Sequence, residues 1–295
     1  MLLIIMVISF CHTTLSEYQI MITYGVPITY SDYSNLSLSW DDCVDACSSN
    51  SSCIVVYEED CQMFSIGQIS KVERLTSGTK VAFRLYQNTT LTCPAEDTLV
   101  ESPFLSYSDP YWTLPTCPEN FTLFVRDEGF WCMQMATSET CLYRNESITA
   151  CAENYGGVLS GIENLEEFNF LAARAIELNK EITDGYAVYF FWVNGDRKST
   201  CMPPTVQSAS CNGTNEFTFS DPTLSSDPQG YVWLSTQPDG LTHPTTPPAD
   251  CLSLKYEDST SSCGIDDCSC AASSKTGTSG YCFKGYACGL QLQLF

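Results

Sequence analysis

The stretch CAENYGGVLSGIENLEEFNFL, residues 151–171, predicts the end of one helix and the beginning of a second. The first helix is expected to begin at Ser147 and to end at the glycine pair that starts at Gly156, because serine favours helix N-termini and glycine favours helix ends. Asn164 and Glu167 form a capping box for the second helix. The apolar residues of this second helix recur at helical spacing, which indicates one core-facing stripe: Leu165, Phe168, Leu171, Ala172, Ala175 and Ile176.

Segments typical of strands surround these helices. TCPENFTLFVRDEGFWC, residues 116–132, predicts a hairpin that Cys117 and Cys132 could close. YAVYFFWVNG, residues 186–195, predicts a buried strand. Trp192 in that strand and Trp233 further along are expected in the core, since large aromatic side chains dominate such interiors.

The composition restricts the class of partner. A formal charge of −22 over 295 residues argues against nucleic acid and anionic membrane surfaces, since both require Lys and Arg to neutralise phosphate. Residues 1–16, MLLIIMVISFCHTTLS, predict a secretory signal peptide, because their apolar run is too short to span a bilayer and small polar residues follow it. No later segment is apolar over about 18 residues. The mature protein is therefore expected to be secreted and soluble, with no membrane span.

Cysteines and glycosylation sequons agree with this expectation. The chain has 18 cysteines, and removing Cys11 with the signal peptide leaves an odd number, which predicts one free thiol or an intermolecular bridge. Six Asn-x-Ser/Thr sequons predict a glycoprotein: Asn35, Asn50, Asn88, Asn120, Asn145 and Asn212.

Two cysteine-rich blocks are joined by residues 94–116, which contain four prolines and no cysteine and are predicted to be a linker. In the first block, residues 17–93, Ser39 and Asp42 predict a helix N-terminus. Cys43 and Cys47 then lie on one helix face and can be tied to neighbouring strands. Those strands are predicted in CIVVYEEDCQMFSIG and KVAFRLYQ.

The segments SWDDCVDAC, CQMFSIG and SGTKVAF of this block resemble the PAN or apple-like modules of the nematode subtype. The resemblance covers about 75 residues and implies a small disulfide-pinned module that binds other proteins. It leaves the partners of Cys61 and Cys93 open. Zinc is disfavoured as the alternative for the cysteine cluster, because the chain is predicted to be secreted and no histidine is near.

The second block, residues 117–290, resembles the C-type lectin-like domain. The matching segments, in order, are CP, CAENYGGVLSGIENLEEFNFL, FWVNG, YVWLSTQPDG before DCLSL, GIDDCSC and GYCF. The resemblance spans about 170 residues and implies an α+β fold with two helices, two small antiparallel sheets and a long loop region. It also implies that Cys151 bonds Cys282 and that Cys251 bonds Cys270. Cys201 and Cys211 are expected to close their own short loop. The sequence alone does not assign disulfide partners to four further cysteines: Cys141, Cys263, Cys268 and Cys288.

The same resemblance implies a calcium site in the long loop region. The family takes its ligands from an acid-or-amide/Pro/acid-or-amide triplet, from an acid near the third core cysteine and from an Asn-Asp pair, and sugar hydroxyls complete the shell. The corresponding residues here are Gln237 and Asp239, which flank Pro238 with an expected cis bond, and the pair Asp266 and Asp267.

One position departs from the family pattern. Ala249 stands where the family has its acidic ligand, so that Asp250, next to it, becomes the remaining candidate. The order amide-Pro-acid goes with galactose-type sugars in this family. The resemblance therefore implies calcium as a cofactor and galactose-type glycans as partners.

An enzyme is not expected, because the mature chain has one histidine, His243, which excludes most Ser-His and Cys-His constellations. The expected function is that of a secreted two-module protein that binds galactose-type glycans with the help of calcium. The alternative is a calcium-independent protein-interaction module that retains a relic of the sugar site.

Overall fold

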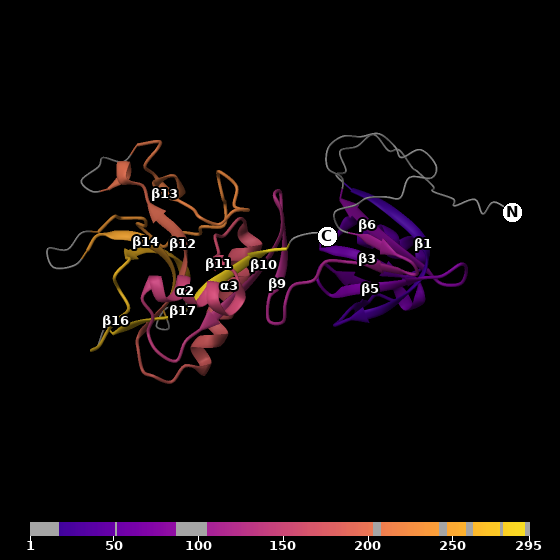
Figure 1. The fold of residues 1–295 in the computed structure, drawn as a ribbon, viewed down its shortest axis with the longest axis horizontal. Helices are drawn as coiled ribbons and strands as arrows, with labels where there is room; N and C mark the ends of the chain where they lie inside the picture. The colour runs from indigo at the N-terminus through magenta and orange to yellow at the C-terminus, as the bar shows by residue number, and fades with distance from the viewer. Residues whose placement is uncertain are drawn as a thin grey trace. The chain divides into compact units, whose positions relative to one another are not determined.

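The computed structural model describes residues 18–50, 52–86, 105–202, 208–241, 247–257, 262–277 and 280–292, and the chain divides into two compact units between Pro118 and Glu119 (Figure 1). The predicted signal peptide, the sequon at Asn88, Cys93 and His243 lie outside the described residues. No helix in the described ranges is long and apolar enough to cross a bilayer.

The first unit is a sheet of eight strands in the order β2-β4-β3-β6-β1-β5-β8-β7, together with one helix. Its elements are β1 (Tyr18–Tyr30), β2 (Ser34–Asn35), α1 (Trp40–Ser49), β3 (Cys53–Tyr57), η1 (Glu59–Cys61), β4 (Gln62–Ser65), β5 (Ile69–Arg74), β6 (Lys80–Tyr86), β7 (Ser106–Ser108) and β8 (Tyr111–Thr113). Both strand segments predicted from the sequence are strands here, and CIVVYEEDCQMFSIG forms β3 and β4 around the short helix η1.

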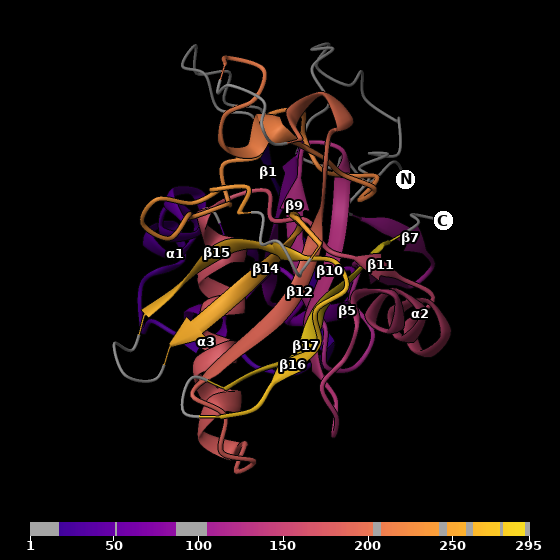
Figure 2. The same ribbon diagram turned by 90° about the vertical axis from the view of Figure 1, so that its left-hand side faces the viewer.

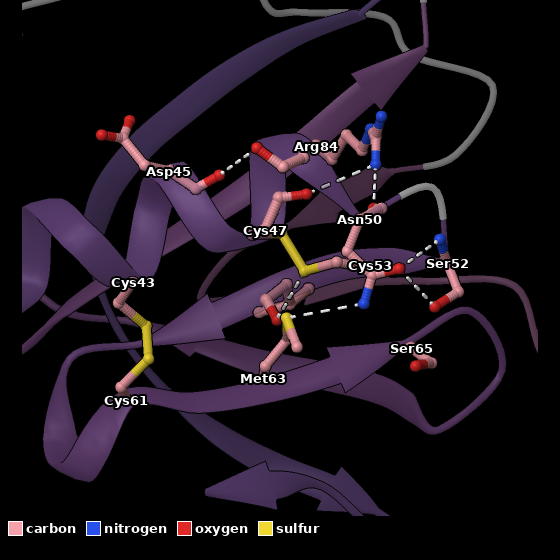
Figure 3. The surroundings of a disulfide bond; sticks show 12 residues. Cys43, Asp45, Cys47, Asn50, Ser52, Cys53, Cys61, Met63, Ser65 and Arg84 are labelled. Carbon is pink, nitrogen blue, oxygen red and sulfur yellow. Dashed lines mark hydrogen bonds between the residues drawn. A yellow bond between two sulfur atoms is a disulfide. The ribbon is translucent and has the colours of Figure 1, made fainter. Parts of the chain in front are cut away.

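Two disulfides attach helix α1 to this sheet, as the spacing of its cysteines predicts (Figure 3). Ser39 caps the helix by accepting the N–H of Asp42 at 3.4 Å. Cys43 bonds Cys61, and Cys47 bonds Cys53, so the partner of Cys61 is now known. Beside the second disulfide the buried Arg84 donates to the carbonyl oxygen of Cys47.

The predicted linker is partly wrong, because residues 105–114 belong to the first sheet. Strands β7 and β8 form a hairpin, and β8 pairs with β5. Trp112 is buried and its ring lies 4.5 Å from the ring of Tyr107. The prolines mislead here because Pro110 occupies the hairpin turn and Pro115 follows the last strand, where neither interrupts a ladder.

Replacing Trp112 with alanine should destabilise the first unit by about 3–5 kcal/mol and leave the second unit unchanged, because a buried tryptophan of the first core is removed. Hydrogen exchange of the full chain measures this. Amides of β5 and β8 should lose protection, while those of β12 (Val188–Arg197) keep it. Unchanged protection in β5 would show that the hairpin is a linker after all.

The second unit is a nine-stranded sheet with the central order β15-β14-β12-β17-β10-β9, and Figure 2 faces it with β14 and β15 beside β12. Its elements are β9 (Thr122–Arg126), β10 (Gly129–Thr137), α2 (Arg144–Tyr155), β11 (Val158–Leu159), α3 (Leu165–Glu181), β12, η2 (Ser199–Cys201), η3 (Gly213–Glu216), β13 (Phe217–Thr218), β14 (Ala249–Glu257), β15 (Ser262–Ser269), β16 (Ser274–Lys275) and β17 (Tyr281–Gln291). The α+β class is as predicted. A parallel pairing of β12 with β17 connects the strands into one sheet, where the resemblance implied two.

The two helices of this unit follow the expected signals with one shift at the start. Helix α2 begins at Arg144 and not at Ser147, because Glu146 accepts the N–H of Tyr143 at 2.7 Å and caps the helix earlier. It ends at Gly156, which has a positive φ of 69°.

Helix α3 has the predicted cap, with Asn164 accepting the N–H of Glu167 at 3.1 Å. Leu165, the first residue of the helix, is 57% exposed and does not belong to the buried part of the predicted stripe. The stripe otherwise packs into the core with Trp131 and Phe191. Trp192 is fully buried as predicted, and Trp233 is partly buried against the core that contains Trp131 and Phe191.

One implied disulfide is wrong. Cys151 bonds Cys288, and Cys282 bonds Cys141. The reason is that the segment before α2 reaches the start of β17, where the N–H of Leu142 donates to the carbonyl of Phe283, whereas α2 itself packs nearer the end of that strand.

Two other disulfide expectations agree with the structure. Cys251 bonds Cys270, and Cys201 bonds Cys211. Cys117 and Cys132 are both disulfide-bonded. In the described ranges two thiols are free, those of Cys263 and Cys268, whereas the odd cysteine count predicts one free thiol or an intermolecular bridge.

Candidate functional site

The predicted sugar-binding triplet lies in a turn that is anchored on strand β15. The backbone of Leu234 donates to the carbonyl of Ile265, and the backbone of Ile265 donates to the carbonyl of Val232. The chain then turns away from the strand, and the bond between Gln237 and Pro238 is cis, as the resemblance implies. We call residues 237–241 the loop turn.

Side chains of the loop turn hold its own backbone. Gln237 accepts the N–H of Asp239 on Oε1 at 3.0 Å, and Asp239 accepts the N–H of Leu241 on Oδ1 at 2.8 Å. Asp239 is exposed and Gln237 is half-buried, so both still present oxygen or nitrogen atoms to solvent. The loop turn thus offers a carboxylate and an amide side by side on the surface.

Asp267 holds the backbone of the loop turn through hydrogen bonds. Its carboxylate is fully buried and accepts the N–H of Asp239 on Oδ1 at 3.0 Å and the N–H of Gly240 on Oδ2 at 2.8 Å. Burial raises the pKa of this carboxyl, whereas the two backbone donors and Arg197 oppose that rise. Asp267 is therefore occupied as a structural acceptor.

The cation beside Asp267 is Arg197, the last residue of β12, which the sequence analysis did not identify. Its guanidinium pairs with Asp267 and with Glu216 at the end of η3. Its Nε donates to the carbonyl of Ala249 at 3.0 Å, and the ring of Phe217 lies 4.7 Å from its Cζ. One signal could have found it, namely an arginine two residues after a predicted buried strand in a chain with 13 Lys and Arg.

Asp266 faces a different cation. Successive strand residues point to opposite faces of a sheet, and Asp266 lies 3.7 Å from Nζ of Lys255 while Asp267 meets Arg197. Burial raises the pKa of Asp266 to about 6, and Lys255 reduces that rise. The two carboxylates therefore pair with different cations, although Asp267 and Asp239 lie near enough to raise the pKa of Asp266 further.

Asp250, the candidate next to Ala249, also belongs to the surroundings of Arg197. Its Oδ1 lies 3.6 Å from Nε of Arg197 and has no hydrogen-bond partner. Burial raises its pKa, and the nearby guanidinium lowers it.

The residues present do not fit a calcium ion. Calcium takes six to eight oxygen ligands, but Asp250 and Asp267 face Arg197, Asp266 faces Lys255, and the loop turn uses oxygens of Gln237 and Asp239 itself. In the described part of the chain, one group of three acidic or cysteine side chains has donor atoms within 4.8 Å of one another, and it consists of Asp196, Cys251 and Cys270. Its two cysteines form a disulfide, which removes them as ligands.

The fold and this site define a lectin-like protein with a second, disulfide-pinned module. The family model C-type lectin domain-containing protein 141/158 matches residues 123–291, and the PAN-like domain model matches residues 20–85. The first match covers more than half of the chain, and the chain therefore belongs to this C-type lectin family. Both resemblances drawn from the sequence are confirmed.

Solved structures similar to this chain are C-type lectin folds of low identity. Human lithostathine is 16% identical over 60% of this chain and 92% of its own, with a TM-score of 0.36. The carbohydrate-recognition domain of the mouse scavenger receptor C-type lectin is 16% identical over 60% of this chain and 99% of its own, with a TM-score of 0.35. No curated protein matches the chain.

The raised pKa of Asp266 predicts that the second unit becomes more stable as the pH falls from 7 to 5. The folded state binds a proton at Asp266 near pH 6, whereas the unfolded chain binds it near the ordinary value of 3.8, so acid favours the folded state in this window. Urea unfolding at both pH values should show a gain on the order of 1 kcal/mol that Asp266→Asn loses. An equal pH dependence in the two proteins would contradict the assignment.

Proposed function

We propose that this protein is a secreted lectin that binds galactose-type glycans through the loop turn and does so without calcium. The observation that supports the proposal is the exposed carboxylate of Asp239 beside the amide of Gln237, in a turn whose backbone is held by the buried Asp267. A preformed surface of this kind loses little conformational entropy when a ligand binds.

The two side chains suit a pair of neighbouring sugar hydroxyls. A carboxylate accepts hydrogen bonds, and an amide both donates and accepts them. The Nε2 of Gln237 lies 3.5 Å from Oδ2 of Asp239, so both groups can reach the two hydroxyls of one ring. The order amide-Pro-acid is the one that the family resemblance links to galactose-type sugars.

Secretion and glycosylation belong to the same proposal. Sixteen residues at the start of the chain have the pattern of a signal peptide. Four described sequon asparagines are exposed, as glycosylation requires: Asn35, Asn120, Asn145 and Asn212. The PAN-like unit, with its pinned helix α1, would provide contacts to other proteins.

Retention on an immobilised galactose resin tests the sugar proposal. The protein should be retained equally in calcium and in chelator, and galactose should elute it. Asp239→Asn should weaken retention at least tenfold, since an amide replaces the acceptor carboxylate while its oxygen can still receive the N–H of Leu241.

The matched control is Asp227→Asn, which makes the same chemical change at an exposed residue outside the loop turn. Retention of this variant should equal that of the unmodified chain. Release by chelator would show that a metal takes part, and equal retention of Asp239→Asn would show that the loop turn does not bind the sugar.

Protein recognition by the same face is the second candidate. Leu241, the last residue of the loop turn, is 53% exposed, and Val232, which precedes the turn, is 37% exposed, so both present apolar surface. Binding to a protein that survives removal of its glycans, and that Leu241→Ser weakens more than Asp239→Asn does, would favour this candidate over the sugar proposal.

A further inference from the structure

We propose that Arg197 is a built-in cation that positions the loop turn and makes its geometry independent of metal. The guanidinium holds Asp267, and Asp267 holds the backbone of Asp239 and Gly240. Arg197 is thus a positioning residue that acts through Asp267. This inference concerns the architecture of the turn and stands whether or not its ligand is a glycan.

Several carboxylates converge on this single positive charge. Glu216 and Asp267 pair with the guanidinium directly, and Asp250 lies near its Nε. The side chains of Arg197 and Asp267 are 1% and 0% exposed, so water does not screen the pair. Buried carboxylates need a cation, because a buried charge without a partner is strongly unfavourable.

An arginine side chain fits the arrangement of these partners better than another cationic side chain would. Its planar fork directs three nitrogens to three partners: Nε to the carbonyl of Ala249, one terminal nitrogen to Glu216 and the other to Asp267. The ring of Phe217 contacts the guanidinium face.

Removing the guanidinium should expose the acidic set to metal. Without it, carboxylates of Glu216, Asp250 and Asp267 and the carbonyl of Ala249 face the vacated volume. The three carboxylates do not all lie within 4.8 Å of one another and have to draw together around an ion, but these oxygens are the donors that calcium prefers. Arg197→Gln adds a further amide oxygen and removes the positive charge that now repels a metal ion. We therefore expect a protein indifferent to calcium to become one that calcium stabilises.

Thermal unfolding of the full chain in calcium and in chelator tests this. The unmodified protein should have the same Tm in both. Arg197→Gln should have a Tm lowered in chelator and raised again by roughly 5–10 °C in millimolar calcium. The double variant Arg197→Gln with Asp267→Asn should lose the calcium response, because one of the new ligands loses its charge.

Arg174→Gln is the charge-matched control, since Arg174 pairs with Glu177 on the exposed face of α3. It should show no calcium response. Hydrogen exchange gives a readout specific to positioning: in chelator, Arg197→Gln should lose protection at the amides of Asp239 and Gly240 before those of β10 and β17.

Arg197→Lys covers the case in which Arg197→Gln does not fold in chelator. Lysine keeps the charge, so this variant should fold with an intermediate Tm and without a calcium response. A calcium-raised Tm in the unmodified protein or in Arg197→Lys overturns the inference. So does an Arg197→Gln variant that unfolds like the unmodified chain in both solutions.

Discussion

The buried guanidinium of Arg197 is the interaction on which the functional end of the second unit depends. Five separate segments meet at it, namely the end of β12, η3, the start of β14, β15 and, through Asp267, the loop turn. Three of these segments bring a carboxylate, and within the described residues Arg197 is the arginine or lysine that forms an ion pair with Glu216 and with Asp267. The guanidinium compensates the buried charge of these carboxylates, and through Asp267 it supports the surface that the loop turn presents.

A second buried arginine in the same unit, Arg126, lies in a cluster that does not reach the protein surface. Arg126 pairs with Glu167 and Asp221, donates to Thr223 and contacts Gly161, and all three charged side chains are fully buried. This set joins β9 to α3 and ends inside the protein. The set around Arg197 ends in two backbone N–H groups of an exposed turn. The cluster around Arg197 therefore affects the binding surface, because it holds an exposed turn, whereas the cluster around Arg126 holds core elements together.

The features of short sequence range were predictable. The Asn164 N-cap of α3, the end of α2 at Gly156, the attachment of α1 and the Cys251–Cys270 bond depend on neighbouring residues or on a well-defined motif, although Glu167 accepts the N–H of Glu163 and does not complete the predicted capping box. The wrong or missed predictions concern contacts between residues that are far apart in the chain. Cys151 had two candidate partners on β17, and only the packing of α2 selects Cys288. Arg197 and Glu216 lie 19 residues apart and Arg197 and Asp267 lie 70 apart, so no local pattern marks their meeting. The loop turn itself was found because its residues are adjacent in the chain.

The distribution of positive charge explains how so acidic a chain can bury carboxylates and what its surface then favours. Of its 13 Lys and Arg, five are buried: Arg84, Arg126, Arg144, Arg197 and Lys284. Four of these pair with a carboxylate, while Arg84 donates to carbonyl oxygens. Cations used inside are not available outside, so the surface retains a large negative excess against a formal charge of −22. A surface of this sign repels anionic ligands at a distance. The acidic loop turn should therefore favour neutral hydroxyl-rich sugars over acidic ones, because a carboxylate such as Asp239 attracts hydroxyl donors and repels a charged glycan.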